Sequence, residues 1–198
     1  MSFESLGLPA ALARAVADSG YTQPTDVQTR AIPLAMAGSD LRVSSSTGSG
    51  KTAAFVLPAL NRVLAARGDA SKRRDNKTVH GPRVLVLAPT RELAMQVANA
   101  TVAYGRHIPG LRVATIVGGV PYHAQLKALR GPLDVLIATP GRLMDHMANG
   151  KAVLANVEML VLDEADRMLD MGFIHDIQTV ADHVPAARQT VMYSATFA

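Results

Sequence analysis

The 198-residue sequence contains no cysteine, and none of its apolar runs approaches the roughly 18 residues that a membrane-spanning helix needs. Without cysteine, the chain can form neither a disulfide framework nor a thiolate metal site. Its first residues, MSFESLGLPA, include an acidic residue and no basic segment before an apolar run, so they do not resemble a secretory signal peptide. We therefore expect a soluble, cytoplasmic protein with no membrane partner.

The chain also has little excess charge, because it contains 20 basic and 16 acidic residues, which gives a net charge of +4. Six basic and two acidic residues lie between Arg67 and Arg83, so this stretch alone accounts for the excess. Since the stretch contains Gly, Pro, Ser and Asn and only Val79 is strongly apolar, it predicts an exposed, mobile loop. The alternative is a basic arm that binds RNA, but a high isoelectric point produced by one polar insert is poor evidence for a nucleic-acid face.

Neither an internal repeat nor an interdomain linker is visible, and 48% of the residues are hydrophobic, which suffices for the core of one domain. Short, continuous Val/Leu/Ile runs alternate with helical segments, a pattern typical of strands buried on both faces of a parallel sheet. This alternation predicts a doubly wound α/β domain with a mainly parallel sheet flanked by helices. The expected strands are 41–45, 84–88, 113–117, 135–138, 159–163 and 190–194, and the expected helices are 24–37, 51–66, 91–107, 122–129, 141–147 and 174–183, with Pro58 kinking the second helix rather than ending it.

A run of small residues, SSSTGSGKT, follows the first expected strand and precedes a helix. Glycines let backbone N–H groups converge on phosphate oxygens, and the start of the helix adds the positive end of its dipole. Lys51 supplies a mobile charge for the outer phosphates, and the Thr52 hydroxyl suits Mg²⁺. An ordinary turn is the alternative, and Ser45 stands where the general pattern has glycine. The predicted nucleotide-binding residues are Ser46, Thr47, Gly48, Ser49, Gly50, Lys51 and Thr52.

Two adjacent carboxylates, Asp163 and Glu164, end the apolar run MLVLDEAD. Carboxylates beside an apolar strand are costly unless a cation or a polar group meets them, and Mg²⁺ is a natural partner for Asp163. Glu164 can then orient and deprotonate an attacking water. The alternative is a helix start with acidic residues in its first turn. With the phosphate loop, the pair predicts a nucleoside triphosphatase in which Lys51, Asp163 and Glu164 are catalytic and Thr52 and Asp163 bind the metal.

The polar motifs TGSGKT, PTRELA, TPGR, DEAD and SAT, in this order, resemble the DEAD-box ATP-dependent RNA helicases of the bacterial type. The resemblance covers essentially the whole chain, and GYTQPTDVQ, at residues 20–28, resembles the adenine-reading Q motif of that family. It implies a single RecA-like P-loop domain over 1–198, with 1–38 as an N-terminal flank that contains the Q motif. It also implies that Gln28 selects adenine, with Tyr21 stacking on the base, and that ATP and Mg²⁺ are the cofactors.

The same resemblance implies RNA as a partner and a second RecA-like domain, absent from this chain, that completes the enzyme. It also implies that the SAT strand lies between the strands that lead into the phosphate loop and into DEAD. The implied coupling residues are Asp166, Ser194 and Thr196. The implied RNA contacts are Pro89, Thr90, Arg91, Gly118, Gly119, Thr139, Pro140, Gly141 and Arg142.

The resulting hypothesis is the ATP- and RNA-binding half of a helicase that couples ATP hydrolysis to local unwinding of RNA. Two alternatives remain open at this point. One is an ATPase that acts on DNA, because no residue pattern here reads a 2′-hydroxyl directly. The other is an ATP-gated RNA clamp or assembly platform without significant unwinding.

Overall fold

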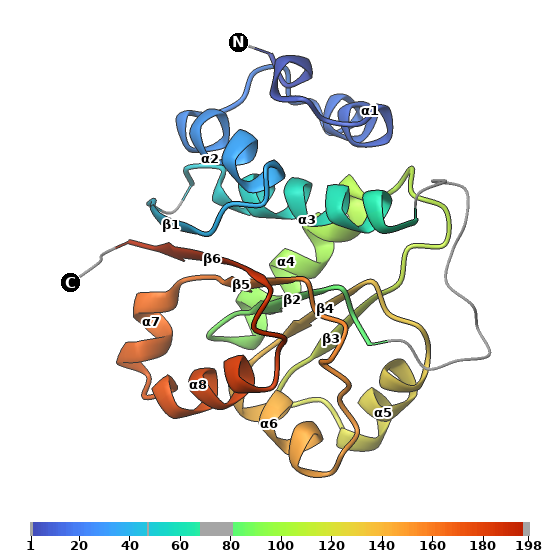
Figure 1. The fold of residues 1–198 in the computed structure, drawn as a ribbon, viewed down its shortest axis with the longest axis vertical. Helices are drawn as coiled ribbons and strands as arrows, with labels where there is room; N and C mark the ends of the chain where they lie inside the picture. Colours follow the sequence, from blue (N-terminus) through green and yellow to red (C-terminus); the bar gives the residue numbers. More distant parts are fainter. Residues whose placement is uncertain (1, 47, 68–80, 196–198) are drawn as a thin grey trace.

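The computed structural model describes residues 2–46, 48–67 and 81–195, and these form one sheet with helices on both faces (Figure 1). Continuous Val/Leu runs form the central strands, whose residues are all buried, as in β2 and β5. All the strand pairs are parallel, and the order is β1-β6-β5-β2-β4-β3. The strands are β1 Leu41–Ser44, β2 Val84–Leu87, β3 Val113–Ile116, β4 Val135–Ala138, β5 Met159–Leu162 and β6 Gln189–Ser194.

The order confirms the position expected for the SAT strand, since β6 lies between β1 and β5. Ser44 at the end of β1 is in register with Ser194 at the end of β6, and Leu162 of β5 pairs with Met192. The carboxyl ends of the strands that precede the phosphate loop and DEAD therefore meet at the same edge of the sheet. We call this edge the carboxyl rim, and the opposite edge the amino rim.

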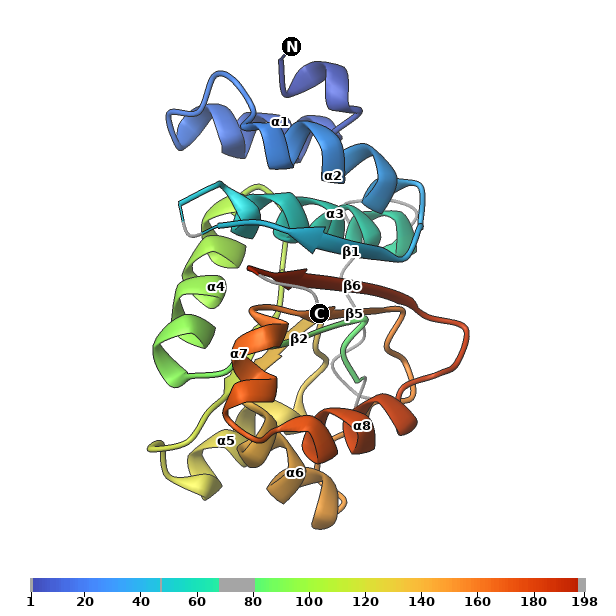
Figure 2. The same ribbon diagram turned by 90° about the vertical axis from the view of Figure 1, so that its left-hand side faces the viewer.

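One helical layer covers one face of the sheet, and a second layer covers the other face (Figure 2). The first layer contains α1 Ala10–Asp18, α2 Asp26–Met36, α3 Lys51–Arg67 and α4 Arg91–Tyr104, preceded by a 3₁₀ turn at Glu4–Leu6. The second layer contains α5 Tyr122–Arg130, α6 Pro140–Ala148, α7 Ala165–Asp170 and α8 Ile174–Asp182. None of the helices within the described ranges is long and apolar enough to cross a membrane.

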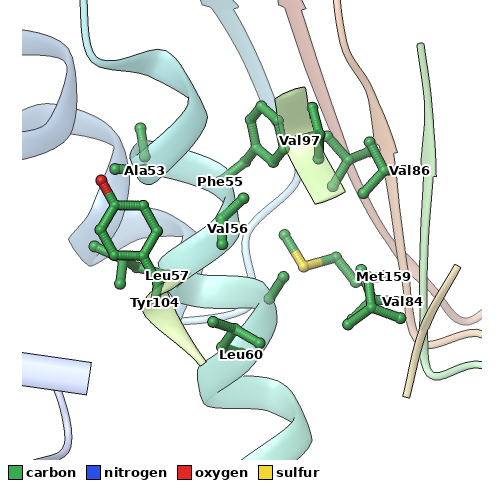
Figure 3. Packing of buried hydrophobic residues seen from close by; sticks show 14 of the residues in the cluster. Ala53, Phe55, Val56, Leu57, Leu60, Val84, Val86, Val97, Tyr104 and Met159 are labelled. Atoms are coloured by element: carbon green, nitrogen blue, oxygen red, sulfur yellow. The ribbon is translucent and has the colours of Figure 1, made fainter. Parts of the chain in front are cut away.

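Each helical layer packs against alternate residues of the same strands, because successive strand side chains point to opposite faces. In β2, Val84 and Val86 belong to the core under α3 and α4, whereas Leu85 and Leu87 belong to the core under α5–α8. Figure 3 shows part of the first of these cores, where Phe55 points from α3 toward Val86 of β2 and Val97 of α4. The buried stretch of α3 from Ala53 to Leu60 anchors the phosphate loop that precedes it.

The helix predictions were correct except at the ends and in two places. The helix through Pro58 continues to Arg67, as expected, whereas α4 ends three residues before the predicted His107 because Gly105 caps it. No prediction covered α1, which buries Leu12 and Val16, and a helix at α7 was considered only as the alternative interpretation of DEAD. The predicted polar loop lies outside the described residues except near its ends.

Candidate functional site

The phosphate loop connects β1 to α3 with a backbone that requires glycine at two positions. Gly48 and Gly50 have φ values of +81° and +86°, in the left-handed region that favours glycine. A Cβ on Gly50 would lie 2.5 Å from Gln28 Nε2, so only glycine lets the Q motif approach the loop this closely. Among the described residues, the hydroxyls of Ser45 and Ser49 are buried and have no hydrogen-bond partner. A loop of this kind leaves donors available for an anion.

Lys51, the first residue of α3, lies against both carboxylates of DEAD. Its Nζ is 2.5 Å from Asp163 Oδ1 and 3.4 Å from Glu164 Oε2. Asp163 is 2% exposed, and this burial raises the pKa of its carboxyl group, although the nearby Lys51 opposes the rise. A second cation near Asp163 would favour its ionised form further.

Glu164 has φ 53° and ψ 53°, the only left-handed non-glycine backbone among the described residues. This conformation costs on the order of 1–3 kcal/mol and is concentrated at functional sites. It turns the chain from β5 into α7, so the side chain points toward Lys51 rather than capping the helix. DEAD does start a helix, as the alternative has it, because Glu164 is the N-cap residue of α7 and Asp166 lies in its first turn, but the Glu164 side chain makes no capping hydrogen bond.

Gln28 is buried and joins the Q motif to the phosphate loop. Its Nε2 donates to the Gly50 carbonyl at 3.0 Å, and its Oε1 accepts from the Thr25 backbone N–H at 3.0 Å, closing a capping box at the start of α2. Gln28 is 5% exposed, so it is not an ordinary surface residue of a helix. An amide oxygen can accept two hydrogen bonds and an amide nitrogen can donate two, so each atom retains capacity for a ligand.

A pocket of about 400 Å³ brings most of the predicted nucleotide-binding residues together. Tyr21, which is 53% exposed, lies at this pocket beside Tyr104 of α4. Burial and the neighbouring Tyr21 hydroxyl raise the pKa of Tyr104 to about 12. The α4 side of the pocket was missed, because PTRELA, which contains Leu93, was interpreted as an RNA contact and the other α4 residues lie outside the motifs. The predicted residues in its wall are Tyr21, Gln28, Gly48, Gly50, Lys51, Thr52, Asp163 and Glu164, and those not anticipated are Gln23, Thr25, Ala53, Leu93, Gln96, Val97 and Tyr104.

A smaller pocket of about 190 Å³ places the predicted coupling residues beside the triphosphatase residues. Asp166 and Ser194 line it together with Lys51 and Glu164. Thr196, the third predicted coupling residue, lies outside the described residues, as does Thr47 of the phosphate loop.

The residues fit Mg²⁺ only if a ligand supplies part of its coordination. Within the described ranges, no three His, Cys, Asp or Glu side chains gather into a site that could hold a metal ion. Thr52 and Asp163 line one pocket, and Mg²⁺ is commonly held by one or two protein oxygens together with substrate phosphates. The donor set therefore matches a metal that arrives with a phosphate group.

The predicted RNA-contact motifs also meet at the carboxyl rim. An Arg91 Nη1 atom lies 3.0 Å from the position that a Cβ on Gly119 would occupy, so PTREL touches the Gly118–Gly119 turn. Arg142 donates from Nη1 to the Val120 carbonyl at 2.6 Å, which joins TPGR to the same turn. The exposed predicted members are Arg91, Gly119 and Gly141, partly exposed are Thr90, Gly118, Thr139 and Arg142, and the buried ones are Pro89 and Pro140.

The comparisons with known proteins agree with this geometry. The sequence profile described as DEAD/DEAH box helicase matches residues 25–198. The chain is 43% identical over 195 residues to the ATP-dependent RNA helicase DeaD of Klebsiella pneumoniae, covering 98% of this chain and 28% of that protein. It is likewise 43% identical over 195 residues to DeaD of Escherichia coli (strain K12), covering 98% and 29%. With the DEAD-box ATP-dependent RNA helicase 52A of Oryza sativa subsp. japonica, the identity is 45% over 203 residues, covering 98% and 34%. The chain thus spans about a third of the length of these curated relatives.

Proposed function

Because the chain belongs to the DEAD/DEAH box helicase family, we propose that it is the ATP- and RNA-binding half of an ATP-dependent RNA helicase that couples hydrolysis to local RNA unwinding. The observation that carries this proposal is the position of Lys51, whose ammonium group lies between Asp163 and Glu164 in the pocket that also contains Gln28. Adenine-reading, phosphate-binding and proton-accepting groups then share one pocket.

Binding begins with groups that the chain already orients. Gln28 and Tyr21 hold the base, while the amides of the loop before Lys51 hold the phosphates. Lys51 exchanges one of its carboxylate partners for a phosphate oxygen, which keeps its charge paired. Thr52 and Asp163 would hold Mg²⁺, which neutralises phosphate charge when it is bound.

Hydrolysis requires a base near the outer phosphate, and we assign this role to Glu164. Its carboxylate is 26% exposed and therefore accessible to water, whereas Asp163 is almost fully buried. Glu164 would orient the water and accept its proton. Asp166 and Ser194, in the adjoining pocket, would couple nucleotide binding and hydrolysis at this site to the position of the RNA-binding turns.

RNA binding would use the turns that converge at Gly119. Main-chain N–H groups at a glycine turn and at the start of α6 suit phosphate oxygens, and Arg91 adds an exposed charge. These turns form one wall of a binding channel, and the proposal assigns the other wall to a second RecA-like domain. That domain would also supply the arginine that stabilises the transition state.

The test compares ATP turnover by residues 1–198 with turnover by the chain joined to a second RecA-like domain, each with and without RNA. We expect the 198-residue chain to bind adenine nucleotide weakly, to hydrolyse ATP about 10³–10⁵-fold more slowly and to unwind nothing. RNA-stimulated hydrolysis by the single domain at the rate of the two-domain protein would contradict the proposal. Strand displacement on RNA and DNA duplexes separates the helicase from its alternatives, because a clamp displaces neither and a DNA-directed ATPase prefers DNA.

A further inference from the structure

A buried polar cluster lies directly behind the Gly118–Gly119 turn, on the side away from the nucleotide pocket. Its centre is Gln125 of α5, which is 4% exposed. Gln125 Nε2 donates to the Val117 carbonyl at 2.7 Å. Gln125 Oε1 accepts from Arg142 Nη1 at 3.2 Å and lies 3.0 Å from His146 Nε2. One amide therefore joins the residue before the turn to two residues of α6.

Arg142 holds the other end of the same turn. Its Nη1 also donates to the Val120 carbonyl at 2.6 Å, so both hydrogens of this nitrogen are engaged within the protein. The carbonyls on the two sides of Gly118–Gly119 are thus each fixed by a side chain from a helix. The turn cannot shift relative to α6 without breaking one of these bonds.

His146 completes the cluster from the interior of α6. Its side chain is fully buried, its ring stacks on Tyr122 with centroids 4.1 Å apart, and the Tyr122 hydroxyl accepts from Asn149 at 2.9 Å. Burial and the charge of Arg142 lower the pKa of His146, so the ring is neutral at pH 7. A neutral ring with its hydrogen on Nε2 is the form that donates to Gln125.

We propose that Gln125, Arg142 and His146 form a positioning network that holds the Gly118–Gly119 turn and the TPGR turn in one fixed relation, and that Arg142 serves this network rather than binding an RNA phosphate. This inference rests on the proposed RNA-binding function of the two turns. Amides that are already ordered bind a phosphate without the entropy cost of ordering them. The network therefore raises RNA affinity although Gln125 and His146 lie out of reach of RNA.

The network is tested by Gln125→Met, which keeps the length of the side chain and removes its hydrogen bonds. Gln178→Met, the same change at an exposed position of α8, is the matched control. The direct readout is the heteronuclear NOE of the Gly118 and Gly119 amides, which reports motion of the turn. We expect these values to fall in Gln125→Met and to stay at the wild-type level in Gln178→Met.

The consequence for RNA is measured as the affinity for a labelled single-stranded oligouridylate at several salt concentrations. Gln125→Met should weaken binding about three- to tenfold and leave ADP affinity unchanged. Arg142→Met should have a similar effect, and the double variant should be no weaker than either single variant, because both remove the same network. Neither change should alter the slope of log affinity against log salt.

Two outcomes would overturn the inference. Unchanged NOE values in Gln125→Met would mean that the network does not order the turn. A salt slope reduced by about 0.7 in Arg142→Met, with RNA affinity intact in Gln125→Met, would mean that Arg142 binds a phosphate.

Failure of the proposed function has a different signature: the wild-type chain binds no RNA, while the turn still loosens in Gln125→Met. Should Gln125→Met fail to fold, Gln125→Glu replaces it. At a pH where the new carboxyl group is ionised, this change keeps an acceptor for α6, removes the donor to Val117 and adds a negative charge beside Arg142, and the same loosening of the turn is expected.

Discussion

The two rims of the sheet contain the same kinds of charged side chain in opposite arrangements. At the amino rim, Arg67 Nη2 lies 3.0 Å from Asp134 Oδ2, and the same oxygen accepts from the Arg112 backbone at 2.8 Å. Glu158, just before β5, pairs with Arg83 at 2.9 Å. These charges hold together segments that meet at the starts of the strands.

At the carboxyl rim, one ammonium group serves two carboxylates. Lys51 pairs with Asp163 and Glu164, while the hydroxyls of Ser45 and Ser49 have no partner among the described residues. Glu164 also has a strained backbone there. Charge and burial alone therefore do not mark a binding site, and neither do a pocket or unpaired polar atoms, because Arg67 Nε and Asp134 Oδ1 at the amino rim are also buried without a partner in the described part of the chain and a pocket lies beside Glu158. What distinguishes the carboxyl rim is the strained backbone of Glu164 and the single ammonium group that pairs with two carboxylates.

The largest effect is expected from Glu164→Gln at the carboxyl rim. The change keeps the shape of the side chain but removes the base, so ATP turnover in a two-domain protein should fall about 10²–10⁴-fold. Nucleotide affinity should survive. Lys51→Ala is the contrasting variant, since loss of its charge should lower nucleotide affinity itself. Normal turnover in Glu164→Gln would show that the base is another group.

The opposite result is expected at the amino rim from Asp134→Ala. This change leaves the buried Arg67 guanidinium without its carboxylate, which typically costs about 3–5 kcal/mol. Urea unfolding should show this loss of stability, and ADP affinity, measured under conditions where the variant is folded, should not change. Asp134→Asn, which retains an acceptor, should cost less. If Asp134→Ala kept full stability but bound ADP more weakly, the amino rim would contribute to nucleotide binding and the proposed difference between the rims would be wrong.

A smaller effect is expected from Gln28→Ala, which removes a base-reading group and also opens the capping box. Loss of a paired contact at a base edge costs about 1–3 kcal/mol. The opened capping box should weaken ADP and GDP binding equally, whereas loss of base reading should weaken only ADP. Titration calorimetry with both nucleotides therefore separates the two roles. An unchanged ratio of ADP to GDP affinity would contradict adenine reading.

The smallest effect on stability is expected from the protonation of His146, which belongs neither to the ion pairs of the amino rim nor to those of Lys51. Its pKa is lowered in the folded chain, so below the ordinary value of about 6.5 the unfolded chain binds a proton that the folded chain does not. Stability from this residue is complete above that pH and is lost as the pH falls. Between pH 7.5 and 5.5, urea unfolding should show the wild type losing more stability than His146→Gln. Equal losses would mean that the ring is protonated in the folded state.

Much of the fold could be predicted because its central strands are continuous apolar runs. Val84–Leu87 and Met159–Leu162 were recognisable in this way, and the alternation with helices indicated a parallel sheet. The position of β6 between β1 and β5 came from the family resemblance, and the order of the other strands was not predicted. The short α1 was missed although Leu12 and Val16 show helical spacing.

The site could be predicted where its functional residues are consecutive in the sequence, as in the phosphate loop and DEAD. It was not predictable where distant segments meet. Nothing local to Gln125 indicates that its amide reaches Val117, Arg142 and His146. Likewise, Tyr104 belongs to the nucleotide pocket only because the end of α4 lies beside the Q motif.

The nucleotide site is tested most directly by a titration of the chain with ADP and Mg²⁺, followed through its backbone amide resonances. We expect the largest shifts at Gln28, Gly48, Gly50 and Lys51, with no change at Asp134 on the amino rim. Shifts centred on the amino rim, or none at the phosphate loop at saturating ADP, would contradict the proposed site.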